Sequence, residues 1–221
     1  MTMPQHHATP ELLMDYASGT MPAAPALAIA SHLALDPQAA ADYSAWTRLG
    51  GALLERLEPV AAVDDAEMAR MLARLDDDVE AADPVTAKAA APEIDALPYP
   101  LRQVLGAPLG RLAWRRVAPG VREFKLPIDG CRHKAVLLSI APGRAVPRHR
   151  HGGQELTLVL AGGYRDGGLA FDRGDLQIAD ESINHRPVAD PVEGCICLVV
   201  LDAPIRFTGP LARWLNGLVR Y

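Results

Sequence analysis

The pattern of apolar and polar residues divides the chain into two parts. Over residues 1–82, apolar residues recur at helical spacing between capping signals. From residue 99 onward, short runs such as HKAVLLSIAPG and ELTLVLAGG alternate with Gly and Pro turns, a rhythm typical of an antiparallel barrel or sandwich. Residues 83–98 are rich in Ala and Pro and indicate a linker. We therefore predict an α+β chain: a small helical bundle at 1–82, a linker at 83–98 and an antiparallel β-barrel or jelly roll at 99–221.

Capping residues mark where the first three helices begin. Thr9 precedes Pro10, a pair that favours a helix start, and Asp36 precedes Pro37 in the same way. The pattern predicts one helix ending near Gly19, a second over about 24–35 and a third from Asp36 to about residue 57. These helices are joined by short loops, which favours packing against one another.

A fourth helix is predicted to begin at Asp64-Asp65. Its apolar residues form a single stripe, which consists of Met68, Met71, Leu72 and Leu75. Such a stripe either faces the interior of the bundle or contacts a partner protein, and the pattern alone favours the interior slightly.

Charge separates the two parts as clearly as periodicity does. Residues 1–82 carry 13 Asp and Glu against 4 Lys and Arg, whereas the rest of the chain carries 14 against 18. The total of -5 and the absence of a long apolar run argue against direct nucleic-acid binding and against a membrane span. The N-terminus lacks the pattern of a signal peptide, so we expect a cytoplasmic protein.

One segment of the second part carries metal-binding chemistry. His149 and His151 are two residues apart, so on a strand they share a face, and Glu155 opens the following apolar strand. His185 is the remaining candidate in the later barrel sequence. Imidazoles with a carboxylate suit one divalent ion, with zinc the first choice and iron, manganese and nickel as alternatives. Four protein ligands favour a structural zinc, while a site with open positions would permit chemistry.

The spacing resembles the first motif of the cupin family. Gly143, His149, His151, Glu155 and Gly162 stand at each defined position of that motif. In the second motif, the usual Pro-x-Gly before the last histidine is absent, and Gly174 and His185 alone resemble it. The resemblance implies a cupin barrel, and the departure leaves open how His185 is presented.

The whole chain resembles the ChrR family of anti-sigma factors. The likeness includes QHHATPELLMDYASGTM, ASHLALDPQ, ELTLVLAGGYRD, DLQIADESINHRPVAD and CICLVVLDAPIRF. It implies an N-terminal helical domain that binds a sigma factor of the extracytoplasmic-function (ECF) group and a cupin-like zinc domain needed for the response to a signal.

The N-terminal domain departs from that family at its zinc motif. His7 and His32 match the two histidine positions, but Asp36 and Ala39 occupy the cysteine positions. Loss of two thiolates removes most of the affinity of a structural zinc site. Asp36 could supply one oxygen ligand, but it is better explained as the cap of the third helix. We therefore expect this domain to lack tightly bound zinc, with His6 able to replace His7 beside His32.

Three functions remain open from the sequence. The first is an anti-sigma regulator that sequesters an ECF sigma factor and whose cupin metal site receives an oxidative or small-molecule signal. The second is a cupin metalloenzyme of the dioxygenase or isomerase type, although no evident catalytic residue adjoins the metal motif. The third is a non-catalytic sensor of a small ligand.

Overall fold

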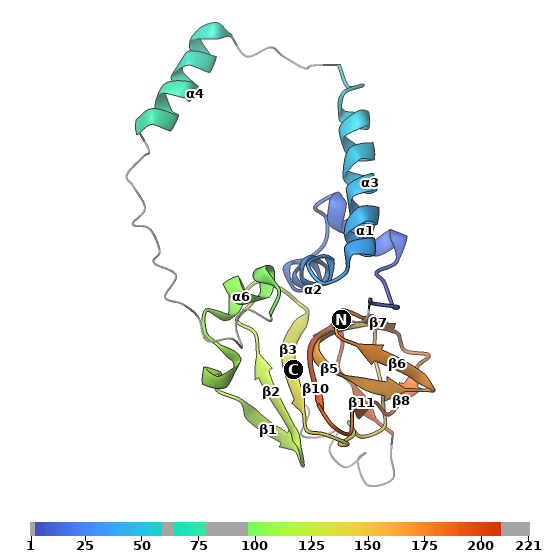
Figure 1. Cartoon of the computed structure of the whole chain (residues 1–221). Coiled ribbons are helices and arrows are strands. Elements are labelled where there is room, and N and C mark those ends of the chain that lie inside the picture. Colours follow the sequence, from blue (N-terminus) through green and yellow to red (C-terminus); the bar gives the residue numbers. More distant parts are fainter. Residues whose placement is uncertain (1–2, 59–63, 78–96, 209–221) are drawn as a thin grey trace.

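The computed structural model describes residues 3–58, 64–77 and 97–208, and its helices precede its strands along the chain (Figure 1). The helices are α1 (Pro10–Ala17), α2 (Ala23–Leu33), α3 (Pro37–Leu54), α4 (Asp65–Asp77), α6 (Tyr99–Leu105) and the 3-10 turn η1 (Leu109–Arg111). This arrangement of helices followed by an antiparallel sheet confirms the predicted α+β class.

The strands form two antiparallel sheets, which together make the barrel. They are β1 (Arg115–Ala118), β2 (Val121–Lys125), β3 (Lys134–Ile140), β4 (His149–Arg150), β5 (Glu155–Asp166), β6 (Leu169–Asp172), β7 (Leu176–Ala179), β8 (Asn184–His185), β9 (Val188–Ala189), β10 (Cys195–Leu201) and β11 (Arg206–Phe207). The larger sheet runs β1-β2-β3-β10-β5-β6, with β7 and β9 also paired to β5, and the smaller one runs β11-β4-β8.

The predicted caps begin the first and third helices. The Thr9 hydroxyl accepts a hydrogen bond from the Leu12 amide at 3.4 Å, and Asp36 Oδ1 accepts from the amides of Gln38 and Ala39. Each cap satisfies amide groups that have no partner inside a helix. Helix starts in this half therefore follow from local sequence.

Alternation along the central strands gives the large sheet two different faces. On β3, Ala135 and Leu137 belong to the core that the helices share, whereas Val136 and Ile140 belong to a second core inside the barrel. Side chains of successive strand residues point to opposite faces, so one short strand serves both cores.

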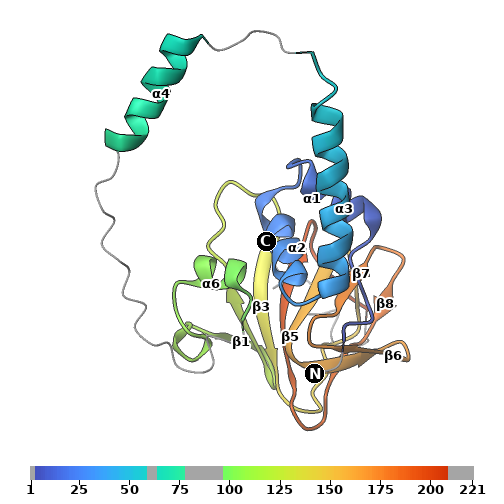
Figure 2. The same ribbon diagram turned by 45° about the horizontal axis from the view of Figure 1, so that its top comes forward.

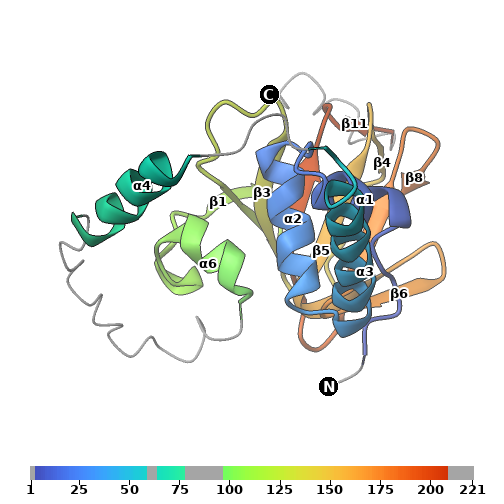
Figure 3. The ribbon, with the colours of Figure 1, turned by 90° about the horizontal axis from the view of Figure 1, so that it is seen from above.

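Helix α2 covers the outer face of that sheet. It contacts β5 and β10, and Figures 2 and 3 show it lying across the strands with α1 and α3 beyond it. Its residues Ala24, Ala28 and Ile29 are fully buried in one cluster with Leu158 and Leu198 of the sheet. The helical part and the barrel thus share a continuous apolar core, while domain boundaries at 82 and 98 stay a prediction.

Helix α4 does not join the compact bundle that the loop lengths suggested. Its side chains described between Asp65 and Arg74 are all exposed, whereas α1, α2 and α3 contact one another. The expectation that its stripe lies in the bundle interior is therefore wrong for Met68, Met71 and Leu72; the side chain of Leu75 lies outside the described part. The linker predicted at 83–98 lies outside the described residues except for its last two.

In the part of the chain that the structure describes, no helix has the length and apolar character needed to cross a bilayer.

Candidate metal centre

Three histidines converge inside the barrel. Strand pairing places His149 of β4 directly opposite His185 of β8, which explains how His185 is presented without the usual Pro-x-Gly. Nε2 of His185 lies 3.0 Å from Nε2 of His149 and 2.9 Å from Nε2 of His151. All three side chains are buried, and they form the one group of metal-ligating side chains found among the described residues.

The outer hydrogen bonds of two rings fix which nitrogens remain free. Nδ1 of His149 lies 2.8 Å from the carbonyl of Pro147, and Nδ1 of His185 lies 2.5 Å from Oδ2 of Asp166. Because each Nδ1–H donates outward, each Nε2 presents a lone pair to the centre. Two lone pairs 3.0 Å apart repel unless a proton or a metal ion lies between them. The three histidines therefore fit a divalent cation.

Burial keeps two of these rings neutral. It lowers the pKa of His149 to about 4, and it lowers the pKa of His151 to about 3 with help from the two neighbouring histidines. A neutral imidazole is the form that binds a metal. At physiological pH the centre therefore offers lone pairs rather than competing protons.

Glu155 lies next to His151, on the side of that ring away from the point where the three histidines converge. Its Oε2 is 3.3 Å from Nδ1 of His151, the nitrogen on the ring edge away from His185, and its Oε1 accepts a hydrogen bond from Thr157 at 2.9 Å. Nδ1 of His151 makes no hydrogen bond. Burial raises the pKa of Glu155 to about 7, so the carboxylate is costly without a cation near it.

A residue that the sequence pattern missed holds His185 in place. Asp166 lies at the end of β5, is buried and contacts Nδ1 of His185 through Oδ2. Although burial opposes ionisation, hydrogen bonds from His185 and Gln177 lower the pKa of Asp166. A carboxylate behind a metal-binding histidine fixes ring orientation and raises ligand basicity.

The sequence pattern could not predict on which face of β5 Asp166 lies, because a bulge interrupts this strand. Asp166 is an odd number of residues from Glu155, so strict alternation would place the two on opposite faces. In the pairing of β5 with β10, however, Cys197 lies opposite Val159 and Ile196 opposite Ala161, which leaves one extra residue in β5. That residue reverses the alternation, so Asp166 faces the same side as Glu155.

A cavity of about 370 Å³ adjoins the metal centre inside the barrel. His149, Glu155 and Thr157 lie on one of its walls, together with Tyr164 and Gln177. Apolar side chains of the neighbouring strands β3 and β10 line the cavity beside β5, and they include Val136, Leu138, Val199 and Leu201. The lining is therefore polar on β5 and β7, beside the metal centre, and apolar on β10 and β3.

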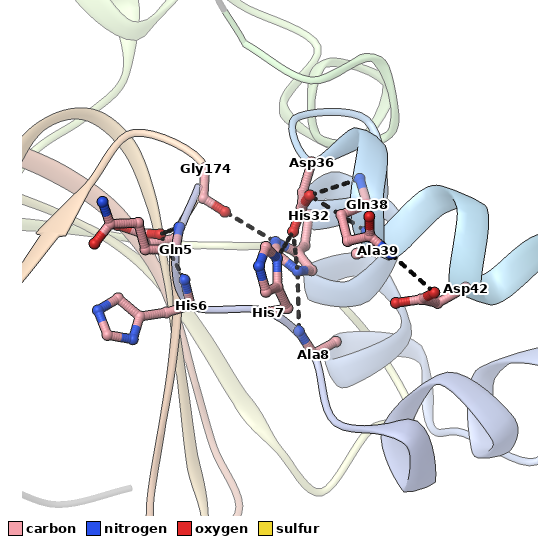
Figure 4. Close-up of polar contacts among 11 residues, drawn as sticks. Gln5, His6, His7, Ala8, His32, Asp36, Gln38, Ala39, Asp42 and Gly174 are labelled. Carbon is pink, nitrogen blue, oxygen red and sulfur yellow. Dashed lines mark hydrogen bonds and ion pairs between the residues drawn. The ribbon is translucent and has the colours of Figure 1, made fainter. Parts of the chain in front are cut away.

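A second cluster joins the N-terminal segment to α2 and α3 (Figure 4). Oδ2 of Asp36 lies 2.5 Å from Nδ1 of His7 and 3.4 Å from Nε2 of His32. His32 is fully buried: its Nδ1 donates to the Gly174 carbonyl at 2.9 Å, and its Nε2 accepts from the Ala8 amide at 3.1 Å. The structure thus brings together all three residues that the sequence singled out.

Further hydrogen bonds attach the N-terminal segment to the barrel. Asp175 accepts hydrogen bonds from the amides of Gln5 and His6, and the Leu176 amide donates to the His6 carbonyl. His6 itself points away from the cluster, with Nε2 3.1 Å from the Ala170 carbonyl and its ring against Phe171, so the expectation that it could replace His7 is wrong (Figure 4).

Gly174 is required where these segments meet. Its φ of +98° lies in the region that favours glycine, and a Cβ there would come within 2.7 Å of Pro4. This explains the lone glycine that remains of the second cupin motif.

This second cluster does not fit a zinc ion. Both ring nitrogens of His32 are used by the protein, one oxygen of Asp36 caps α3, and Ala39 offers no ligand. Burial lowers the pKa of His32, so the ring remains neutral and satisfied by its two partners. The Asp36 carboxylate instead connects His7 to the start of α3.

Comparison with known proteins places these features in context. A family model described as the ChrR cupin-like domain matches residues 104–204. Over 216 residues the chain is 39% identical to the anti-sigma-E factor ChrR of Cereibacter sphaeroides, covering 98% of each sequence. It is also similar to a chain in the crystal structure of Rhodobacter sphaeroides SigE in complex with the anti-sigma ChrR, with 38% identity and a TM-score of 0.78, over 90% of this chain and 100% of that chain.

Proposed function

Because the chain belongs to the ChrR family of anti-sigma factors, we propose that its N-terminal helices bind and sequester an ECF-type sigma factor. The observation that carries this proposal is the exposed apolar surface of α3 and α4. Such a role implies a cytoplasmic location, since sigma factors act on RNA polymerase inside the cell.

Half of the large apolar residues that are exposed in the described part of the chain lie on or directly after two helices, α3 and α4. The second half of α3 and the residues after it present Leu49, Leu53 and Leu57, which recur every four residues and therefore share one face, each at least half exposed. Helix α4 presents Met68, Met71 and Leu72. Contiguous exposed apolar side chains of this kind mark interaction surfaces in soluble proteins. We propose these residues, with Leu75, as the anchors that contact the sigma factor.

Charge complements these anchors. The segment 1–82 carries a net charge of -9 from 13 acidic and 4 basic residues. Acidic side chains around an apolar contact steer association and favour basic partner surfaces, while the buried apolar residues supply most of the affinity.

We further propose that His149, His151, His185 and Glu155 bind one divalent metal ion. Zinc is the first choice, with iron, manganese and nickel as alternatives, because imidazole and carboxylate ligands suit all four. The ion would hold β4, β8 and the start of β5 together, and Asp166 would orient His185 toward it. We propose that the N-terminal cluster binds no zinc, and that the barrel receives the oxidative or small-molecule signal.

The sigma proposal is tested by co-purification with the sigma factor encoded beside this gene. The full chain should form a stable one-to-one complex, and Leu53→Asp combined with Met71→Asp should weaken it by at least about a hundredfold, because a charge would be buried at each anchor. Ser44→Asp, on an exposed position of α3 on the side of the helix away from the leucine face, is the matched control. Absence of any complex with the unaltered chain would overturn the proposal.

A further inference from the structure

The cavity beside the metal centre has the size and lining of a ligand pocket. Its volume of about 370 Å³ lies within the range of small-molecule sites, which begins near roughly 300 Å³. The pocket lies on the barrel side of the sheet, away from α2, so the helical part does not fill it. A packed core normally leaves few voids larger than a water molecule. A space of this size in the barrel is therefore better explained as a binding site.

We infer that this cavity binds a small monocarboxylic acid with an apolar body, and that Tyr164, Gln177 and Asp166 connect the bound molecule to His185. The inference deepens the proposed signal-receiving role of the barrel and rests on it. It adds the chemical class of the ligand and the residues that report its presence.

The polarity of the lining indicates the chemical character of the ligand. The wall formed by β3 and β10 presents Val136, Leu138 and Val199, which can pack only against an apolar body. The adjoining strands β5 and β7 present the hydroxyls of Thr157 and Tyr164 and the amide of Gln177, which can hydrogen-bond to an oxygen-bearing head. An amphipathic molecule satisfies both parts of the lining at once.

Charge favours an anionic head over a neutral one. Three cationic side chains line the cavity, namely Arg115, Arg116 and Lys134, against the two carboxylates of Glu123 and Glu155. Glu123 contacts Arg115 directly and Lys134 at 4.0 Å, so its charge is already shared. Any divalent ion on the histidines would add positive charge, and a carboxylate is attracted to all of these groups.

A continuous chain of hydrogen bonds leads from the cavity to the metal centre. The Tyr164 hydroxyl donates to Oε1 of Gln177 at 2.8 Å, and Nε2 of Gln177 donates to Oδ2 of Asp166 at 2.9 Å. The same Oδ2 contacts Nδ1 of His185 at 2.5 Å. A carboxylate that accepts from the Tyr164 hydroxyl would withdraw this donor from Gln177, and the change would reach His185 through Asp166.

The test uses octanoate as the probe and octanol as its uncharged counterpart, on the full chain with cobalt(II) bound and without any sigma factor. Calorimetry should show that octanoate binds one site per chain, at least about tenfold more tightly than octanol, because the lining favours an anion. Octanoate should also change the visible absorption of the bound cobalt.

Two variants locate the binding. Val199→Phe fills the apolar wall and should weaken octanoate binding by at least about tenfold, whereas Val192→Phe, on a residue that is 81% exposed, should leave it unchanged. Tyr164→Phe keeps the ring and removes the hydroxyl, so it should weaken binding by about fivefold and abolish the change in cobalt absorption. It also serves as the decisive variant if Val199→Phe does not fold.

Three results would overturn the inference. The pocket assignment fails if octanoate does not bind, or if folded Val199→Phe and Tyr164→Phe bind it as the unaltered chain does. The ligand class fails if octanol binds as tightly as octanoate. The connection to His185 fails if octanoate binds without changing the cobalt absorption. None of these results depends on the sigma complex, which is measured separately, so failure of one proposal is distinct from failure of the other.

Discussion

Two clusters of histidine and carboxylate side chains have opposite chemistry in this protein. In the N-terminal cluster, His32 donates from one ring nitrogen to the Gly174 carbonyl and accepts with the other from the Ala8 amide. In the barrel, His149 and His185 each bond outward through Nδ1 and leave Nε2 facing a third histidine. The first cluster is complete without a metal, and the second presents unshared lone pairs.

The comparison teaches that histidine count alone does not define a metal site. What matters is whether the protein uses both ring nitrogens or only one. At the N-terminus, Asp36 contacts His7 and His32 and also caps α3, so one carboxylate connects the N-terminal segment, α2 and the start of α3. In the barrel, Asp166 contacts the outer nitrogen of His185 and leaves the inner one free.

The largest expected effect is a difference in bound metal between variants of the two clusters. We expect about one divalent ion per purified chain, and His149→Ala should reduce this to near zero because one of three converging imidazoles is lost. Asp36→Ala should leave the metal content unchanged. Elemental analysis of both variants checks the contrast, with His133→Ala as the histidine control. Two zinc ions per unaltered chain would show that the N-terminal cluster also binds metal.

The second effect concerns the stability that Asp36 provides. Asp36→Ala removes a helix cap and the buried carboxylate that contacts His7, so urea unfolding should show a loss of about 2–3 kcal/mol. Asp42→Ala, an exposed residue on the same helix, should change stability by less than about 0.5 kcal/mol. The loss at Asp36 should be equal with and without a chelator; dependence on the chelator would mean that zinc, not hydrogen bonding, stabilises this cluster.

A third effect tests how Asp166 serves the barrel cluster. Asp166→Asn keeps the size of the side chain but removes the charge behind His185, so metal affinity should fall by about 10–100-fold. Competition with a chromophoric chelator measures this affinity. Asp129→Asn, an exposed change of the same type, should have no effect. If Asp166→Asn binds metal normally, then β4–β8 pairing alone positions His185.

The smallest effect is a pH dependence of the metal-free protein. In the unfolded chain His149 and His151 protonate near pH 6.5, whereas in the fold their pKa values are about 4 and 3. Because the unfolded chain takes up protons at these two histidines first, the free energy of unfolding is highest above pH 6.5 and falls as the pH drops toward 4 and 3.

Glu155 opposes this trend. Its pKa is raised to about 7, so it costs stability as pH rises from 4.5 toward 7. With two histidines against one carboxylate, we expect a net loss of about 1–2 kcal/mol between pH 6.5 and 5. Urea unfolding in chelator measures it. Glu155→Gln should make the loss steeper; a shallower loss would contradict the assignment of the opposing group.

The sequence by itself determined the local elements and the types of ligand. Caps at Thr9 and Asp36, the short β-rich runs between turns and the spacing of His149, His151 and Glu155 depend on neighbours a few residues away, so periodicity and capping rules could predict them. Asp36 and Ala39 at the two cysteine positions likewise lead us to expect no tightly bound zinc at the N-terminal cluster, and the metal analysis above tests that expectation.

Only the tertiary structure decided how distant residues meet. The bulge in β5 turned Asp166 inward, the pairing of β4 with β8 placed His185 opposite His149, and the Gly174 carbonyl occupied one nitrogen of His32. It also left α4 outside the bundle, with the apolar stripe exposed. Each of these outcomes depends on contacts between residues far apart in the chain. Whether a histidine binds a metal or completes a hydrogen-bond network depends on which groups the fold brings to its second nitrogen.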